Sequence, residues 1–193
     1  MISAIIPAAG ESKRMGQPKM LLPWGNSTVL EHVMSTLQLS GIDDILVVTG
    51  GTREKVDELA KVHGVRTIFN EQYANGEMLE SIQCGLAAQR SEAEATLICL
   101  GDQPQVQERS VRMVCDAFRG SKSNVVVPSY QMRRGHPWLV ARPLWGEILD
   151  LRSPRSPRDF LNAYSREIEY VEVENPSILE DLDTPEDYLK FKP

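Results

Sequence analysis

The chain has few cysteines, and their arrangement is not that of a structural bridge or a zinc site. Its 193 residues include only three, Cys84, Cys99 and Cys115. Because the count is odd and no C-x-x-C pair occurs, the pattern argues against a disulfide framework and against bound zinc. We therefore expect three small, buried thiols in a protein of the reducing cytoplasm.

Long apolar runs and an excess of positive charge are also missing. No hydrophobic segment approaches the ~20 residues that a membrane-spanning helix needs, and the first residues lack the basic region of a signal peptide. The formal net charge of −6 suits neither nucleic acid nor an anionic membrane surface. We therefore expect no nucleic acid and no membrane among the partners, while a local basic pocket for phosphates stays compatible with this charge.

Three common signatures of catalytic or nucleotide-binding sites are absent as well. The sequence has no G-x-G-x-x-G, which disfavours a dinucleotide-binding oxidoreductase, and no Gly-Lys-Ser/Thr of the Walker type. No serine lies in a G-x-S-x-G nucleophile elbow. The chemistry must therefore be sought in other clusters of polar residues.

The length and composition that remain suit one domain over residues 1–193. Hydrophobic residues make up 41% and charged residues 25% of the chain, close to the average for globular proteins. A domain of this size buries roughly 70% of the surface that its unfolded chain exposes, so it needs no cross-links. No internal repeat or low-complexity linker interrupts the sequence.

Strand-like apolar runs alternate with helical patterns up to residue 128. The predicted strands cover residues 2–7, 45–49, 65–69, 96–100 and 125–128, and the predicted helices 29–39, 53–63, 79–89 and 110–118. Such alternation indicates βαβ units and a mostly parallel sheet. Beyond residue 128 we expect a hairpin over 129–142 that turns at Arg134-Gly135, helices over 144–149 and 158–164, a strand over 168–173, and a helix that begins at Thr184-Pro185.

Polar clusters follow several of these strands, where ligands bind in open α/β sheets. After the first strand, the small residues of 8–12 can turn backbone N–H groups toward an anion, and Arg14 and Lys19 add positive charge for phosphate oxygens. By spacing alone, an ordinary loop with surface basic residues explains this segment equally well.

Carboxylates occur at two further places. Asp102 follows the strand 96–100 within Gly101-Asp102-Gln103-Pro104, and a carboxylate at such a strand end suits Mg²⁺. An Asp-x-Pro turn is the alternative, and the motif alone favours it. Asp181 can supply a second carboxylate. Favourable placement of acids at a helix start is a strong competing explanation for Asp183 and Glu186, and it explains Asp181 less well.

Two arginines lie beside a glycine in Arg133-Arg134-Gly135-His136-Pro137. Their guanidinium groups can receive a phosphorylated acceptor, but spacing alone favours a solvated hairpin tip. His136 can act as a base, although a single histidine next to proline is more often structural.

Taken together, four segments resemble the MobA/MocA-like NTP transferase family, and they occur in the family's order. The segments are residues 8–16 with 19–22, 101–104, 134–137 and 181–187. The resemblance spans nearly the whole chain. It implies a Rossmann-like, three-layer α/β fold of the glycosyltransferase-A type with a mostly parallel central sheet. It also implies a nucleotide-binding half over about 1–104 and an acceptor-binding half over about 105–193.

The resemblance assigns roles to individual residues. The implied nucleotide-binding set is Ala8, Ala9, Gly10, Glu11, Ser12, Arg14, Met15, Gly16, Lys19, Asn70, Ser81 and Gly101. The implied catalytic residues are Arg14, Lys19 and Asp102, and the implied Mg²⁺ ligands are Asp102 and Asp181, with Asp183 as the alternative second ligand. The implied acceptor-binding residues are Arg134, Gly135, His136 and Pro137.

The segment Ala8-Ala9-Gly10 is similar to the cytidylyltransferase branch of the family. That branch implies CTP and molybdopterin as substrates, pyrophosphate as a product, and transient contact with a molybdoenzyme or its chaperone. One segment departs from the branch, because residues 149–160 replace its Gly-Asp-x-Gly-Ala-Arg stretch and instead carry Arg152, Arg155 and Arg158. The acceptor and the choice of CTP over GTP therefore stay open. A sugar-1-phosphate nucleotidyltransferase and a non-catalytic molybdenum cofactor carrier are the alternatives.

Overall fold

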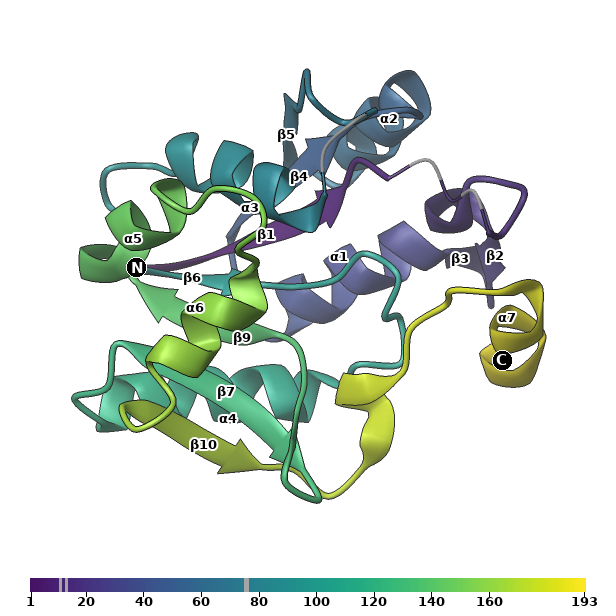
Figure 1. Ribbon diagram of the computed structural model, residues 1–193. Coiled ribbons are helices and arrows are strands. Elements are labelled where there is room, and N and C mark those ends of the chain that lie inside the picture. Colours follow the sequence, from purple (N-terminus) through teal and green to yellow (C-terminus); the bar gives the residue numbers. More distant parts are fainter. Residues whose placement is uncertain (11, 13, 75–76) are drawn as a thin grey trace.

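A central sheet organises the chain in the computed structural model, which describes residues 1–10, 12, 14–74 and 77–193 (Figure 1). The strand order is β10-β7-β9-β6-β1-β4-β5, with β8 paired to β7. The bounds are Ile2–Ala8 (β1), Asp44–Thr49 (β4), Arg66–Phe69 (β5), Ala95–Ile98 (β6), Val125–Tyr130 (β7), Arg133–Arg134 (β8), Trp138–Ala141 (β9) and Ile168–Glu172 (β10). β9 is antiparallel to β6 and β7, and β8 to β7, while the other neighbours are parallel. The predicted mostly parallel sheet is confirmed.

Helices cover both faces of this sheet. Their bounds are Val29–Leu39 (α1), Arg53–Val62 (α2), Met78–Ala87 (α3), Glu108–Gly120 (α4), Trp145–Leu149 (α5), Pro157–Ala163 (α6) and Pro185–Phe191 (α7). Ile6 of β1 packs in a buried cluster with α1, α2 and α4, whereas Ile5 packs in a second cluster with α3, α5 and α6. Neighbouring side chains of a strand point to opposite faces, so one strand serves both clusters. The result is the expected three-layer α/β fold.

A smaller unit of structure lies beside the sheet. The two-residue strands Pro23–Trp24 (β2) and Ser27–Thr28 (β3) pair with each other, and α7 lies next to them (Figure 1). Trp24 and Leu182 are buried in one cluster against which Tyr188 packs, and the Tyr188 hydroxyl donates to the Pro23 carbonyl at 2.7 Å. This packing brings the segment before α7 to the loop that follows β1.

The predicted elements agree closely with the observed ones. The bounds of the predicted strands and helices up to residue 128 differ from the observed bounds by at most two residues. α1 begins at the expected capping box, in which Thr28 and Glu31 exchange hydrogen bonds of 2.7 and 3.3 Å. α7 begins at Thr184, whose hydroxyl accepts from the Asp187 amide at 3.2 Å. Within the described residues, no helix is long and apolar enough to cross a membrane.

The predicted turn at Arg134-Gly135 is wrong. β7 pairs with β8 through Ser129 opposite Arg134, and the chain reverses at Gln131 and Met132, which have φ values of 49° and 64°. A glycine is needed at position 135 for a different reason, because a Cβ there would lie 2.4 Å from the Ile178 carbonyl oxygen. Close packing against the 3₁₀ helix Pro176–Leu179 explains this glycine.

Candidate active site at the carboxyl edge of the sheet

The candidate active site lies where β1 and β6 end. These strands are parallel neighbours, so the segment after β1 and the turn 101–104 emerge at the same edge of the sheet. The segment before α7 reaches this edge too, because the Leu182 amide donates to the Asp102 carbonyl at 3.0 Å. Figure 1 shows the loop after β1 and the segment leading to α7 at the right-hand edge of the molecule. Glu11, one of the predicted nucleotide-binding residues, lies outside the described residues.

The segment after β1 folds around Ser12. The Ser12 carbonyl accepts from the amides of Met15 and Gly16 at 3.0 and 3.2 Å, and the Ser12 hydroxyl accepts from the Lys19 amide at 3.1 Å. These bonds bend the segment so that the side chains of Arg14 and Lys19 both contact the carboxylate of Asp183. The amides of Met15 and Gly16, two members of the predicted nucleotide-binding set, are therefore bonded within the loop.

Several members of the predicted nucleotide-binding set are buried and contribute to packing: Ala8, Ala9, Met15 and Gly101. Met15 is 5% exposed and packs with Trp24. A Cβ on Gly101 would lie 2.9 Å from the sulfur of Met20, so a larger residue there would require the flexible Met20 side chain to shift. Gly10 is exposed, and a Cβ there would meet nothing within 4 Å. Gly16 is likewise exposed, and a Cβ there would also meet nothing within 4 Å, so the segment is open at both glycines.

Two basic and two acidic side chains form an ion-pair cluster at the centre of the site. The Lys19 ammonium contacts the Asp102 carboxylate, and it lies 3.3 Å from Asp183 Oδ1. Arg14 Nη1 lies 3.0 Å from Asp183 Oδ2. Burial alone would lower the pKa of Lys19, but the charges and hydrogen bonds of Asp102 and Asp183 outweigh burial and raise it. Lys19 therefore stays positively charged and forms ion pairs with two carboxylates.

A third carboxylate, that of Asp181, lies beside this cluster. The buried Gln103 side chain donates from Nε2 to Asp181 Oδ1. Burial, followed by the negative charges of Asp102 and Asp183, raises the pKa of Asp181. Negative charge is thus concentrated here beyond what the two nearby cations neutralise.

These carboxylates fit the chemistry of a hard divalent cation. Asp102 and Asp181 are oxygen ligands, and a cation would offset both the burial and the repulsion that raise the pKa of Asp181. In the part of the chain that the structure describes, no group of three or more acidic, histidine or cysteine side chains is arranged to hold a metal alone. Mg²⁺ commonly uses only one or two protein carboxylates and completes its shell with substrate phosphates and water, so the donor set fits a metal that arrives with a nucleotide.

The predicted residues Asn70 and Ser81 meet each other. Asn70 Nδ2 donates to Ser81 Oγ at 3.2 Å, and Asn70 Oδ1 accepts from the Gln72 amide at 3.0 Å. Both residues are 5% exposed. The pair therefore ties the end of β5 to the first part of α3 and supports the edge of the site from within.

A cleft of about 1170 Å³ opens between the start of α3, the β7–β8 hairpin and α6. Three members of the predicted acceptor-binding set, Arg134, Gly135 and His136, line it together with Trp138 and Arg158. Burial lowers the pKa of His136 to about 4, so this imidazole is neutral at neutral pH and is a weak base. The cleft can hold a ligand larger than a single phosphate.

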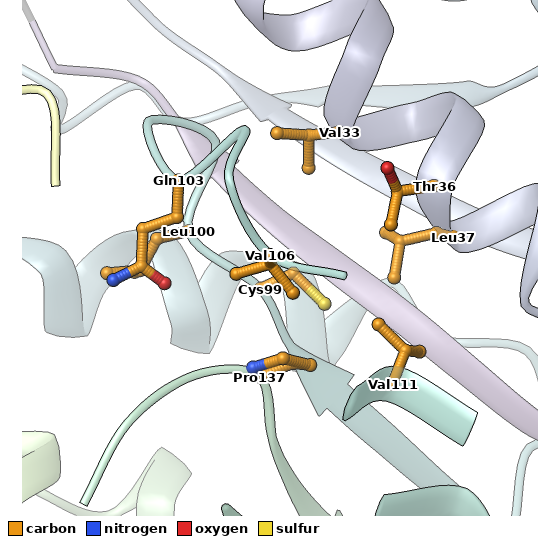
Figure 2. Close-up of a pocket in the computed structure, with 9 residues that line it drawn as sticks. All are labelled: Val33, Thr36, Leu37, Cys99, Leu100, Gln103, Val106, Val111 and Pro137. Carbon is orange, nitrogen blue, oxygen red and sulfur yellow. The ribbon is translucent and has the colours of Figure 1, made fainter. Parts of the chain in front are cut away.

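Pro137, the remaining member of the predicted acceptor set, lies elsewhere. It lines a separate cavity of about 10 Å³ with Leu100, Gln103 and Val106 (Figure 2). This cavity is mainly apolar, and its volume is only about that of one solvent probe. Pro137 therefore packs under the 101–104 turn and does not line the cleft.

The comparisons with known proteins identify the family of this chain. Residues 4–168 match the MobA-like NTP transferase domain. The chain belongs to this family. The family is one of nucleotidyltransferases, so the fold and the family predicted from the four ordered segments are confirmed.

Individual relatives of this MobA-like transferase cover nearly its whole length. It is 32% identical to the molybdenum cofactor cytidylyltransferase of Escherichia coli K12, over 99% of this chain and 95% of that protein. It is 28% identical to nicotine blue oxidoreductase of Paenarthrobacter nicotinovorans, over 98% and 96%. The crystal structure of Rv0371c from Mycobacterium tuberculosis H37Rv in complex with manganese aligns with a TM-score of 0.83 and 25% identity, over 99% and 97% of the two chains.

Some residues near the site of this MobA-like transferase are identified only by the structure and not by the sequence. Gln103 lies next to Asp102 in sequence, but its contact with Asp181 spans 78 positions. Tyr170 and Asn162 line the cleft and both bond to Arg134, although nothing in their sequence surroundings marks them. Contacts between such distant positions leave no local spacing pattern that could have revealed them.

Proposed function

We propose that this chain transfers a cytidylyl group from CTP to the phosphate of a small-molecule acceptor, with Mg²⁺ as the metal and pyrophosphate as the second product. The observation that carries the proposal is the convergence of Arg14 and Lys19 with three carboxylates at the sheet edge. The residues of about 1–104 supply most of the nucleotide site, and those of about 105–193 supply most of the acceptor cleft and the second metal ligand, Asp181.

The relatives support the finer parts of this proposal. The name of the Escherichia coli relative favours CTP as the donor and molybdopterin, or a related phosphorylated pterin, as the acceptor. The manganese complex of the mycobacterial relative supports a divalent metal. The 1170 Å³ cleft has room for an acceptor of that size.

In the proposed reaction an acceptor phosphate oxygen attacks the α-phosphorus of CTP. A new P–O bond joins the acceptor to the cytidylyl group, and the bond from the α-phosphorus to the bridging oxygen breaks as pyrophosphate leaves. A phosphate monoester is largely ionised near neutral pH, so the nucleophile needs no general base. The low pKa of His136 agrees with such a mechanism.

The side chains of the site position the phosphates and balance their charge. Arg14 and Lys19 exchange their carboxylate partners for phosphate oxygens of the nucleotide. Mg²⁺ held by Asp102 and Asp181 would neutralise charge on the transferring phosphoryl group. The open backbone near Gly10 lets the triphosphate approach the end of β1.

The test is pyrophosphate release with Mg²⁺ and each of CTP, GTP, ATP and UTP, with and without molybdopterin. We expect release that requires CTP and molybdopterin together and that falls by ~10²–10³ in Asp102→Ala, the scale for losing one preorganised charge contact. Asp43→Ala is the matched control, because Asp43 is an exposed carboxylate just before β4, at the opposite edge of the sheet. Full activity of Asp102→Ala would contradict the proposed metal site.

A second candidate function is oxidoreductase chemistry, which the likeness to nicotine blue oxidoreductase favours. It predicts tight binding of NADH or NADPH and no release of pyrophosphate from any NTP. The same preparation can be titrated with both nucleotides and with CTP. Binding of a nicotinamide nucleotide in place of CTP would replace the transferase proposal with this one.

A further inference from the structure

The guanidinium of Arg134 is held in a fixed position at the wall of the cleft. Its Nε donates to the Tyr170 hydroxyl at 2.9 Å, and its Nη1 donates to Asn162 Oδ1 at 2.8 Å. Its central carbon also lies 5.6 Å from the centre of the Tyr170 ring. The three residues come from β8, β10 and α6, so separate elements converge on one side chain.

The partners of Arg134 are neutral, which distinguishes it from other arginines of the chain. Arg14 and Arg66, for example, lie within 3.0 Å of aspartate carboxylates. Among the described residues, the hydrogen-bond acceptors around Arg134 are the hydroxyl and amide oxygens just named. A guanidinium has five N–H donors, so two neutral bonds orient it while its charge and its remaining donors stay available.

The surroundings of Arg134 in the cleft are positively charged. Arg133 and Arg158 line the same cleft, and Glu77 is the one acidic residue among its described lining residues. This excess of positive charge occurs in a chain whose formal net charge is −6. The local charge therefore favours an anionic group, and the planar guanidinium matches the oxygens of a phosphate.

Arginine normally loses rotamer freedom when it binds an anion. A side chain that is already oriented loses less on binding. Because Tyr170 and Asn162 are exposed, their bonds to Arg134 contribute little to the stability of the fold. The main effect of this arrangement is to hold one charged group in place.

We propose that Tyr170 and Asn162 are positioning residues that hold Arg134 for the phosphate group of the acceptor. The inference rests on the proposed function in one respect, the identity of this cleft as the acceptor site. Tyr170 and Asn162 act through Arg134 and do not themselves touch the reacting atoms.

The test begins with Tyr170→Phe, which removes the hydroxyl and keeps the ring. In the assay with CTP and molybdopterin we expect the KM for molybdopterin to rise about tenfold, the effect of losing one hydrogen bond to a charged group, with the KM for CTP unchanged. Tyr130→Phe is the matched control, because its hydroxyl accepts from Gln131 and it is not among the residues that line the cleft. An unchanged KM for molybdopterin in Tyr170→Phe would overturn the proposal.

A double-mutant cycle separates positioning through Arg134 from an independent role. If Tyr170 acts through Arg134, then adding Tyr170→Phe to Arg134→Met should change the KM for molybdopterin no further. The same holds for Asn162→Ala in that background. A tenfold effect that persists without Arg134 would show that these residues do not work by positioning it.

A binding measurement keeps this inference separate from the proposed reaction. Phenyl phosphate combines a dianion with a flat ring, and its binding to the complete chain can be followed by the broadening of its ³¹P NMR signal. We expect binding that Arg134→Met abolishes and that Tyr170→Phe weakens about tenfold. That result would support the inference even if no NTP released pyrophosphate. The inference would be refuted if phenyl phosphate did not bind, or if neither substitution weakened its binding.

Discussion

Lys19 connects the two kinds of ligand that the site is proposed to hold. Its ammonium contacts the carboxylate of Asp102 and lies near that of Asp183, yet it is also the cation proposed to meet the triphosphate. Under the proposed function, a metal and a nucleotide that bind together would resolve this competition, because Asp102 would hold the metal while Lys19 would pair with the phosphates. A metal alone would separate Asp102 from Lys19 and leave Lys19 without a new partner. A nucleotide alone would separate Lys19 from Asp102 and leave Asp102 without a new partner.

Lys19→Met should therefore change two affinities in opposite directions. Mn²⁺ alone should bind about tenfold more tightly, equivalent to ~1.4 kcal/mol, because the carboxylates lose a competing cation. The complex of Mn²⁺ with CTP should bind more weakly, because the phosphates lose a partner. Electron paramagnetic resonance of free Mn²⁺ measures both affinities, and Lys61→Met on the exposed side of α2 provides the control. Changes in the same direction would argue against a shared role for Lys19.

The residues of the site were only partly predictable from sequence. Arg14, Lys19 and Asp102 follow strands at an edge where ligands gather, and the structure brings them together. For Asp183 the sequence offers a strong competing explanation, because a carboxylate near a helix N-terminus is favourable without any ligand. Its pairing with Lys19 joins positions 164 residues apart, which no local pattern encodes.

At the scale of secondary structure, hydrophobic periodicity and helix caps predict most helices and strands. The predicted turn at Arg134-Gly135 is wrong because tertiary packing sets the need for glycine there. The capping boxes of α1 and α7 involve residues three apart, so they are visible in sequence. The sequence predicts a turn at Gly135, because glycine is common in turns. Its true constraint is the carbonyl of Ile178, which the chain reaches only after folding.

Gly135→Ala should destabilise the fold by about 1–3 kcal/mol, the cost of overpacking. The added methyl group would overlap the carbonyl oxygen of Ile178 at 2.4 Å and push the 3₁₀ helix Pro176–Leu179 away from β8. Urea denaturation measures the change in the free energy of unfolding. Gly146→Ala, in α5 with nothing within 4 Å of the new methyl group, should instead be neutral or stabilising. Equal effects of the two substitutions would contradict this explanation.

At the scale of the whole molecule, two buried clusters on either side of the sheet protect the thiols. Cys99 and Cys115 are buried in one cluster with α1 and α4, and Cys84 is half-buried against the other. Burial raises the pKa of all three, that of Cys115 to about 11. The predicted small, buried thiols are thus found at two of the three positions.

The folded protein should therefore react slowly with a thiol reagent such as Ellman's reagent at pH 8. The thiolate is the reactive form, and a raised pKa lowers its fraction at this pH. As the pH rises toward 11, the reaction of the native protein should accelerate more than the reaction of the unfolded chain, whose thiols are already ionised. Three thiols should react quickly in urea, and rapid reaction of Cys99 or Cys115 in the native state would contradict the observed packing.

The attachment of the Asp181–Asp183 segment to Asp102 also has a consequence for the timing of synthesis. Lys19 and Asp183 are 164 positions apart, and chains grow at roughly 5–20 residues per second, so about 8–30 seconds separate the two residues at the ribosome. The parallel strands β1, β4, β5 and β6 are all made well before Asp183. During this interval Lys19 has no Asp183 to pair with, and a nascent chain can begin to form its sheet while it still lacks the last carboxylate of its proposed site.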